Sequence, residues 1–188
     1  MTEQKQITGD NIIHALDFFK QKKGTEGLNE LDAEVEFDIK NVYEERWYPI
    51  ENYIQLLEKF DKKFEYKEYS ISFRIGFDRS RRIGLLNNNN GKINPKLALG
   101  KVQENWWRYN NFGSVELKEI DENHLNIYIC ENINHALYCE RMRGFFAGVL
   151  REICNQEEPK VKKTKCVSNG EKYCKFEASW KIDDGLPK

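Results

Sequence analysis

Long apolar runs are missing from this sequence of 188 residues. A membrane-spanning helix needs roughly 18 or more consecutive apolar residues, and no segment approaches that length. The first residues, Met1 to Asp10, are polar and lack the hydrophobic centre of a secretion signal. We therefore expect a cytoplasmic protein that does not enter a membrane.

An excess of charge of one sign is missing too. Lys and Arg number 30, Asp and Glu number 31, and the formal net charge is -1. Without a basic surplus there is no general electrostatic attraction to nucleic acid, so we expect no nucleic-acid partner. The local basic run at 160–165 is typical of a solvated strand face.

The composition excludes a disordered chain. Apolar residues make up 39% and aromatic residues 13%, so a core can form although 32% of the residues are charged. The length suits one domain of ordinary size. We predict a single domain over 1–188, with a mainly helical half at 1–112 and a strand–helix–hairpin half at 113–182.

Recognisable catalytic patterns are also lacking. The three histidines, His14, His124 and His135, are scattered along the chain. The glycines lack the context of a phosphate-binding loop, and no nucleophile motif stands out. We therefore assign no catalytic residue, and the sequence does not favour an enzyme.

Helical periodicity is present throughout the first half. After Pro49, which suits the first turn of a helix, the residues Ile50, Tyr53, Leu57 and Phe60 share one apolar face. The same reasoning predicts helices near 10–23, 25–31, 69–84 and 95–109, an extended stretch at 35–39 and a loop at 87–91.

The apolar period changes to two after Gly113, which predicts strands near 115–119 and 125–129. A helix near 134–155 and two strands near 160–167 and 171–182 follow. This order predicts an α+β fold in which a helical N-terminal layer packs on an antiparallel sheet.

The last hairpin carries two of the five cysteines. An odd number of cysteines in a reducing compartment indicates thiols or a metal rather than a disulfide framework. Around the Asn169-Gly170 turn signal, a two-residue turn would pair Cys166 with Tyr173. A three-residue loop would pair Cys166 with Cys174 and place both sulfurs on one face.

Three interpretations of this cysteine pair stay open: a structural zinc with a third cysteine and one further ligand, free buried cysteines, or a reversible cross-strand disulfide. Cys139 and Cys154 lie on one predicted helix, roughly 22 Å apart at 1.5 Å per residue. At most one of them can therefore join Cys166 and Cys174.

The stretch from Cys139 to Gly148, followed by Cys166 and Cys174-Lys175-Phe176, resembles the 4-vinyl reductase-like domain. The shared pattern is a cysteine before an arginine-glycine helix, then a cysteine, a glycine turn and Cys-x-Phe. This domain is grouped with haem-based NO sensors and TRAPP vesicle-tethering subunits. The similar segment covers roughly residues 133–180, and it implies a TRAPP-like or haem-NO-binding-like fold.

The resemblance also implies a metal site. Cys139, Cys166 and Cys174 match the cysteines that hold a structural zinc in members of this family, and Lys163 stands where those members have an acidic ligand. Glu140 or Glu171 could supply the missing carboxylate. Haem is disfavoured, because we find no Tyr-x-Ser-x-Arg segment of the kind that a haem sensor needs besides its axial histidine.

For function, the resemblance implies a sensory or regulatory domain that binds a small hydrophobic or aromatic molecule. A homodimer and a protein partner for the output are further implications. Alternatives are an accessory or reductase-type protein acting on a tetrapyrrole, and a dimeric adaptor of TRAPP type. Candidate pocket residues are large apolar side chains: Trp106, Trp107, Phe112, Phe145 and Val149.

Overall fold

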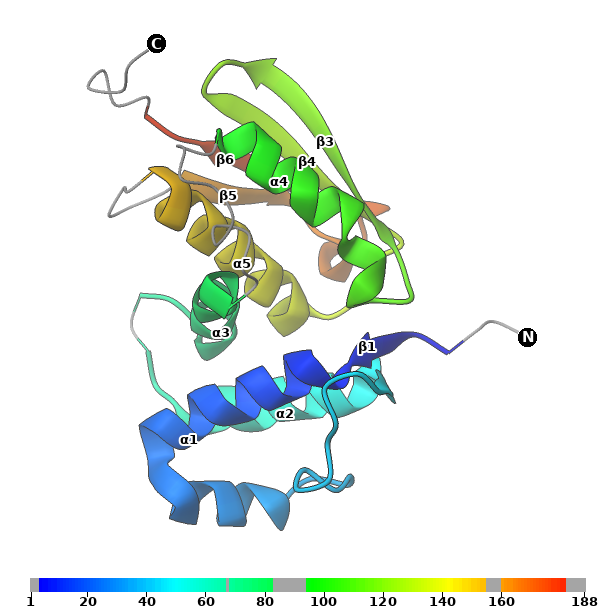
Figure 1. The fold of residues 1–188 in the computed structure, drawn as a ribbon, viewed down its shortest axis with the longest axis vertical. Coiled ribbons are helices and arrows are strands. Elements are labelled where there is room, and N and C mark those ends of the chain that lie inside the picture. The colour runs from blue at the N-terminus through cyan, green and yellow to red at the C-terminus, as the bar shows by residue number, and fades with distance from the viewer. Residues whose placement is uncertain (1–3, 67, 83–93, 155–159, 182–188) are drawn as a thin grey trace.

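The computed structural model describes residues 4–66, 68–82, 94–154 and 160–181. Figure 1 shows three levels: a pair of helices, a second pair above it, and a sheet with one helix lying across it. The predicted α+β class, a helical layer on an antiparallel sheet, is confirmed. Among the described residues, no helix combines the length and hydropathy needed to cross a bilayer.

The first level contains α1 (Gly9–Asp32) and α2 (Ile50–Lys63). The helices predicted at 10–23 and 25–31 are one element with a kink at Gly24, whose φ of 73° suits a residue without a side chain. A short antiparallel pair, β1 (Gln6–Thr8) with β2 (Trp47–Pro49), joins the starts of these helices.

The second level contains α3 (Ile71–Arg82) and α5 (Ala136–Cys154). Small residues let the two backbones meet, because a Cβ atom built on Gly76 would collide with the Arg141 carbonyl. A Cβ on Gly144 would collide with the Phe73 carbonyl in the same way. α3 therefore lies directly against α5, with α1 and α2 on its other side (Figure 1).

The sheet has the order β3-β4-β6-β5, and all neighbours are antiparallel. Its strands are β3 (Ser114–Asp121), β4 (His124–Cys130), β5 (Lys160–Lys165) and β6 (Tyr173–Ser179). Leu125, Ile127 and Ile129 of β4 and Phe176 of β6 are buried. The alternation in the sequence thus follows from one face of the sheet being covered by helices.

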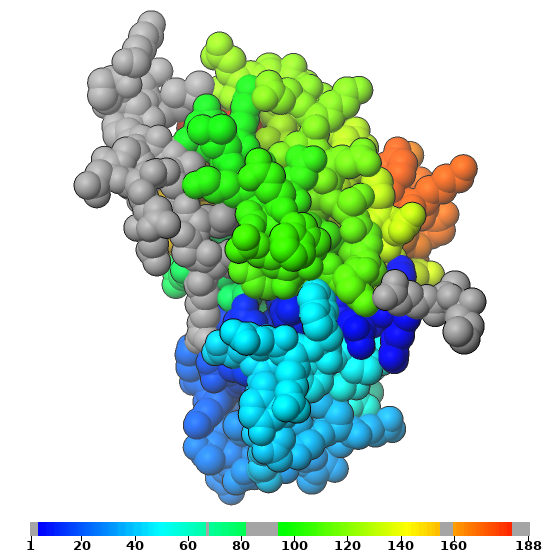
Figure 2. All heavy atoms as spheres, turned by 45° about the vertical axis from the view of Figure 1, so that its right-hand side comes forward, coloured from blue at the N-terminus to red at the C-terminus, as the bar shows by residue number. Residues whose placement is uncertain are grey.

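The helix α4 (Pro95–Glu104) lies across the sheet and is followed by a single 3₁₀ turn, Trp106–Arg108. Asn94 caps α4, since its side chain accepts a hydrogen bond from the Lys96 backbone N–H, and Pro95 occupies the first turn. In Figure 2 the N-terminal residues form the lower part of the molecule, and α4 with β3 and β4 forms much of the upper part.

Two local predictions are wrong or lie elsewhere. Residues 35–39 adopt turns and bends rather than an extended strand. Val35, Phe37 and Ile39 instead pack individually on the core, so their alternation reflects burial without strand pairing. The loop predicted at 87–91 and the end of the helix predicted at 69–84 lie outside the described residues.

Candidate functional site

Three cysteines converge where α5 meets the last hairpin. Cys139 comes from α5, Cys174 from the inward face of β6, and Cys166 follows β5. The Sγ atom of Cys174 lies 3.4 Å from that of Cys139 and 3.9 Å from that of Cys166. All three residues are buried, and their sulfurs lie within 4.8 Å of one another.

The loop of this hairpin is longer than predicted. The strands pair Lys165 with Lys175, and continuing that register places Cys166 opposite Cys174. The connection is a 3₁₀ turn at Val167–Asn169, closed by Gly170 with a φ of 86°, rather than a three-residue loop. Of the two pairings that the sequence left open, the structure has the one that brings Cys166 to Cys174, but through a loop longer than three residues.

Hydrogen-bond donors surround the Cys174 sulfur. The Cys139 thiol is the main cause of a Cys174 pKa lowered to about 5, and this lowering outweighs the opposing effect of burial. The Val167 backbone N–H and the Asn132 amide add further donors at 3.5 and 3.3 Å. The hydrogen bond to Cys174 correspondingly raises the pKa of Cys139. These hydrogen bonds favour the charged form of Cys174 over that of Cys139.

The carboxylates expected to complete a metal site are engaged elsewhere. Glu140 pairs with Lys163 at 2.6 Å and with Arg143 at 2.8 Å. Glu171 pairs with Lys165 at 3.3 Å. Neither joins the three sulfurs in the part of the chain that the structure describes.

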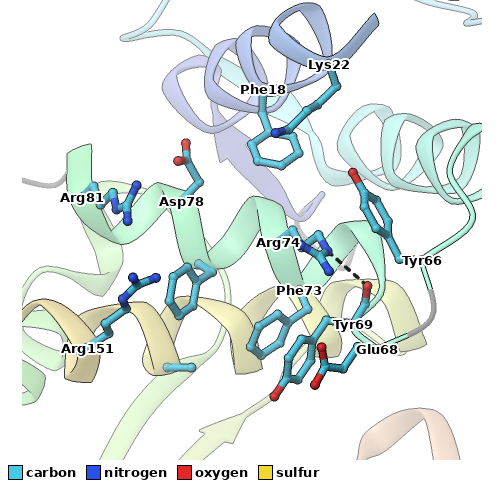
Figure 3. A pocket seen from close by; sticks show the side chains of 12 residues that line it. Phe18, Lys22, Tyr66, Glu68, Tyr69, Phe73, Arg74, Asp78, Arg81 and Arg151 are labelled. Atoms are coloured by element: carbon cyan, nitrogen blue, oxygen red, sulfur yellow. Dashed lines mark hydrogen bonds between the residues drawn. The ribbon is translucent and has the colours of Figure 1, made fainter. Parts of the chain in front are cut away.

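A pocket of about 470 Å³ opens between α1, α3 and α5. Figure 3 shows Phe18 and Lys22 reaching into it from α1, opposite residues of α3 and Arg151 of α5. Its wall combines aromatic rings with charged groups: Phe18, Lys22, Tyr66, Glu68, Tyr69, Phe73, Arg74, Phe77, Asp78, Arg81, Ala147 and Arg151. The volume lies in the range of small-molecule sites, about 300–1,000 Å³.

Cations outnumber carboxylates in this wall by four to two. Arg81 is paired with Glu152 at 3.1 Å. The Arg74 guanidinium instead stacks 4.2 Å from the Tyr66 ring centroid, and that of Arg151 lies 5.3 Å from the Phe77 ring centroid. Within the described ranges, neither of these two arginines has a carboxylate partner, so the pocket has cationic groups to offer an anion.

The five pocket candidates named from the sequence lie elsewhere. Trp106, Phe112, Phe145 and Val149 are buried core residues, and Trp107 is 67% exposed. Trp106 donates its indole N–H to the Phe112 carbonyl at 2.8 Å. The pocket between α1, α3 and α5 does not include them, and their role in binding stays a prediction.

Sequence reasoning missed the residues that do line this pocket. On α3, Phe73 and Phe77 are four positions apart, and so are Arg74 and Asp78. This spacing places the two members of each pair next to each other on the helix surface, which the sequence alone could have indicated. The contribution of α1 and α5 had no such signal, because it depends on tertiary packing. Phe18 and Arg151 line the same pocket only because the fold brings α1 and α5 to α3.

Comparison with known proteins shows which fold this is. The solved H-NOX protein from S. oneidensis in the Fe(II)NO ligation state is similar over 94% of this chain and 100% of its own, at 11% identity and a TM-score of 0.73. The unliganded Fe(II) H-NOX protein from K. algicida covers 96% of this chain and 100% of its own, at 13% identity and a TM-score of 0.72. No protein-family model and no curated protein matches the chain.

These findings correct the resemblance drawn from the cysteine motif. The similar solved structures are H-NOX domains rather than 4-vinyl reductase-like or TRAPP proteins, and they align over nearly the whole chain. The motif covered only part of the chain, about 133–180, so it could not decide between families. At such low identity the comparison establishes the fold.

The cofactor expectation, which was structural zinc with haem disfavoured, is contradicted as well. A structure of this fold was determined to study heme distortion in the H-NOX family. The argument against haem rested on one missing local segment. Zinc lacks support because Glu140 and Glu171, the proposed fourth ligands, are both engaged in ion pairs.

Proposed function

We propose that this chain is a small-molecule-binding sensory domain whose ligand occupies the pocket between α1, α3 and α5. The ligand combines an aromatic or apolar body with at least one anionic group. The H-NOX-like fold supports the sensory role, since those proteins are described with NO and haem iron. The homodimer, the protein partner for output and the single domain over 1–188 stay predictions.

The observation that carries the proposal is an aromatic wall beside arginines that have no carboxylate partner among the described residues. Phe18 and Phe73 form part of an aromatic wall, and Arg74 and Arg151 offer guanidinium groups for a carboxylate, sulfonate or phosphate. Arginine binds such groups through two parallel hydrogen bonds. An adjoining hollow adds Lys160 and Lys162, so basic side chains extend beyond the pocket.

Haem is the first candidate ligand because of the shared fold. The pocket residues fit its chemistry in two respects: the arginines suit its carboxylates, and the rings suit its plane. Among the lining side chains, the phenols of Tyr66 and Tyr69 are of a type that ligates haem iron. Bound haem would supply an iron centre for a diatomic gas.

Two probes test the proposal: protoporphyrin IX, which is metal-free haem, and the aromatic sulfonate 8-anilinonaphthalene-1-sulfonate. We expect Arg74→Met to weaken binding of both by about tenfold or more, since a hydrogen bond to a charged group contributes about 1.5–3 kcal/mol. Equilibrium fluorescence titration measures the affinities. The dimethyl ester of protoporphyrin IX, which lacks the anionic groups, should bind more weakly than the acid.

The matched control is Arg108→Met. Arg108 is exposed, lies outside the pocket and stacks on Trp107. The proposal is wrong if this control weakens binding as much as Arg74→Met, or if neither probe binds. Hemin binding more tightly than protoporphyrin IX would identify a contribution of the iron.

A further inference from the structure

One guanidinium group in the core lacks a carboxylate partner. Arg141 of α5 is 5% exposed. Its Nη2 donates to the Asn11 side-chain oxygen at 2.6 Å, and its Nη1 lies 3.0 Å from the Met142 sulfur. Within the described residues its Nε–H has no hydrogen-bond partner, and the guanidinium forms no ion pair. Because arginine stays charged in proteins, Arg141 keeps a positive charge in the core.

The charges near Arg141 leave it uncompensated. The second buried cation of this region is Arg79 of α3, which pairs with Asp10. Burial lowers the pKa of Arg79, Asp10 raises it, and Arg141 lowers it further. The Asp78 carboxylate lies 3.1 Å from the His14 ring nitrogen and lines the ligand pocket. Arg141 therefore calls for a negative charge of its own, since a buried charge without a partner costs free energy.

A second donor without a partner lies beside Arg141. Tyr53 of α2 is fully buried, and its hydroxyl has no hydrogen-bond partner in the described part of the chain. Its ring centroid lies 5.8 Å from the guanidinium carbon, and that of Phe145 lies 5.7 Å from it. These rings attract the cation but leave the Nε–H unbonded. The hydroxyl of Tyr138 differs, because it donates to the Asn110 side-chain oxygen at 3.1 Å.

We propose that Arg141 and Tyr53 bind a small monovalent anion, chloride, inside the core between α2 and α5. Chloride accepts hydrogen bonds from both donors and balances the guanidinium charge, whereas a water molecule supplies no charge. Met142 makes room for the ion, since its thioether side chain is flexible. The site is separate from the pocket between α1, α3 and α5, whose wall includes neither Arg141 nor Tyr53.

The test is the melting temperature of the whole chain while chloride replaces gluconate, a much larger anion, at constant ionic strength. We expect a rise of about 5–10 °C once chloride reaches about 100 times its Kd, because the ion binds the folded chain alone. Arg141→Met should abolish this dependence on chloride. The proposal is overturned if the unchanged chain melts at the same temperature in both salts, or if Arg141→Met retains the rise.

Tyr53→Phe keeps the test decisive if Arg141→Met fails to fold. Losing the hydroxyl should weaken chloride binding about tenfold or more, since a hydrogen bond to a charged group is lost. Tyr138→Phe is the matched control, because it removes an equally buried hydroxyl that already has a partner. This control should melt lower and bind chloride with unchanged affinity. Equal losses of chloride affinity in the two variants would contradict the site.

Discussion

Trp106 and Trp107 are neighbours in the chain with opposite surroundings. Trp106 is 7% exposed, and its indole N–H donates to the Phe112 carbonyl inside the core. Trp107 is 67% exposed, with the Arg108 guanidinium 5.6 Å from its ring centroid. Trp106 therefore makes a buried hydrogen bond, whereas Trp107 makes an aromatic contact at the surface.

Trp106→Phe should lower the free energy of unfolding by about 1–3 kcal/mol, because the buried Phe112 carbonyl loses its partner. Urea denaturation measures the change. Trp107→Phe is the matched control and should stay within about 0.5 kcal/mol of the unchanged protein. Equal losses for the two variants would show that the buried hydrogen bond contributes nothing of its own.

The arrangement of the cysteines was only partly predictable from the sequence. The hairpin spacing allowed Cys166 to pair with either Tyr173 or Cys174, and the helix rise allowed at most one of Cys139 and Cys154 to join them. The sequence could not reveal that Lys163 would hold Glu140 at 2.6 Å. That ion pair depends on where β5 lies against α5.

Among the elements, α3 and α5 make the closest helix pair of the fold through Gly76, Gly144 and Gly148. Gly144 and Gly148, two small residues four positions apart on α5, allow another backbone to approach this helix closely. The structure shows that α3 does. Since α3 and α5 also carry most of the pocket wall, their spacing sets the pocket shape.

Gly144→Ala should lower the free energy of unfolding by at least about 1–3 kcal/mol, because the added methyl group meets the Phe73 backbone, which cannot rotate away. Gly100→Ala is the matched control, since a Cβ at Gly100 meets nothing within 4 Å. That variant should be neutral or stabilising by about 0.4–1 kcal/mol. Thermal denaturation measures the stability of both variants. A Gly144→Ala protein as stable as the Gly100→Ala protein would contradict direct packing of the α5 backbone on the α3 backbone.

Short and bent elements were beyond sequence reasoning. The three-residue strands β1 and β2 pair across about forty residues, and neither has a periodic pattern of its own. The kink at Gly24 leaves the apolar spacing on both sides helical, so it was interpreted as two helices. Long, strongly patterned elements such as α2 and β4 were predicted near their observed places.

At the scale of the whole molecule, the fold class followed from element order, but the binding site did not. The pocket takes Phe18 from α1, Arg74 from α3 and Arg151 from α5, three segments that are far apart in the sequence. Helical patterning predicts which face of each helix is apolar, and it leaves open which helices become neighbours. Four of the five pocket candidates, Trp106, Phe112, Phe145 and Val149, lie in the core, and their role in binding stays a prediction.

The most direct test of the account is hydrogen–deuterium exchange on the whole chain with and without protoporphyrin IX. We predict slower exchange in peptides covering residues 18–22, 66–78 and 147–151, because ligand binding stabilises the elements that line the pocket. Peptides of β3 and the turn at Trp106–Arg108 should exchange as before. Protection confined to those latter peptides, or no protection anywhere, would contradict the proposed ligand site.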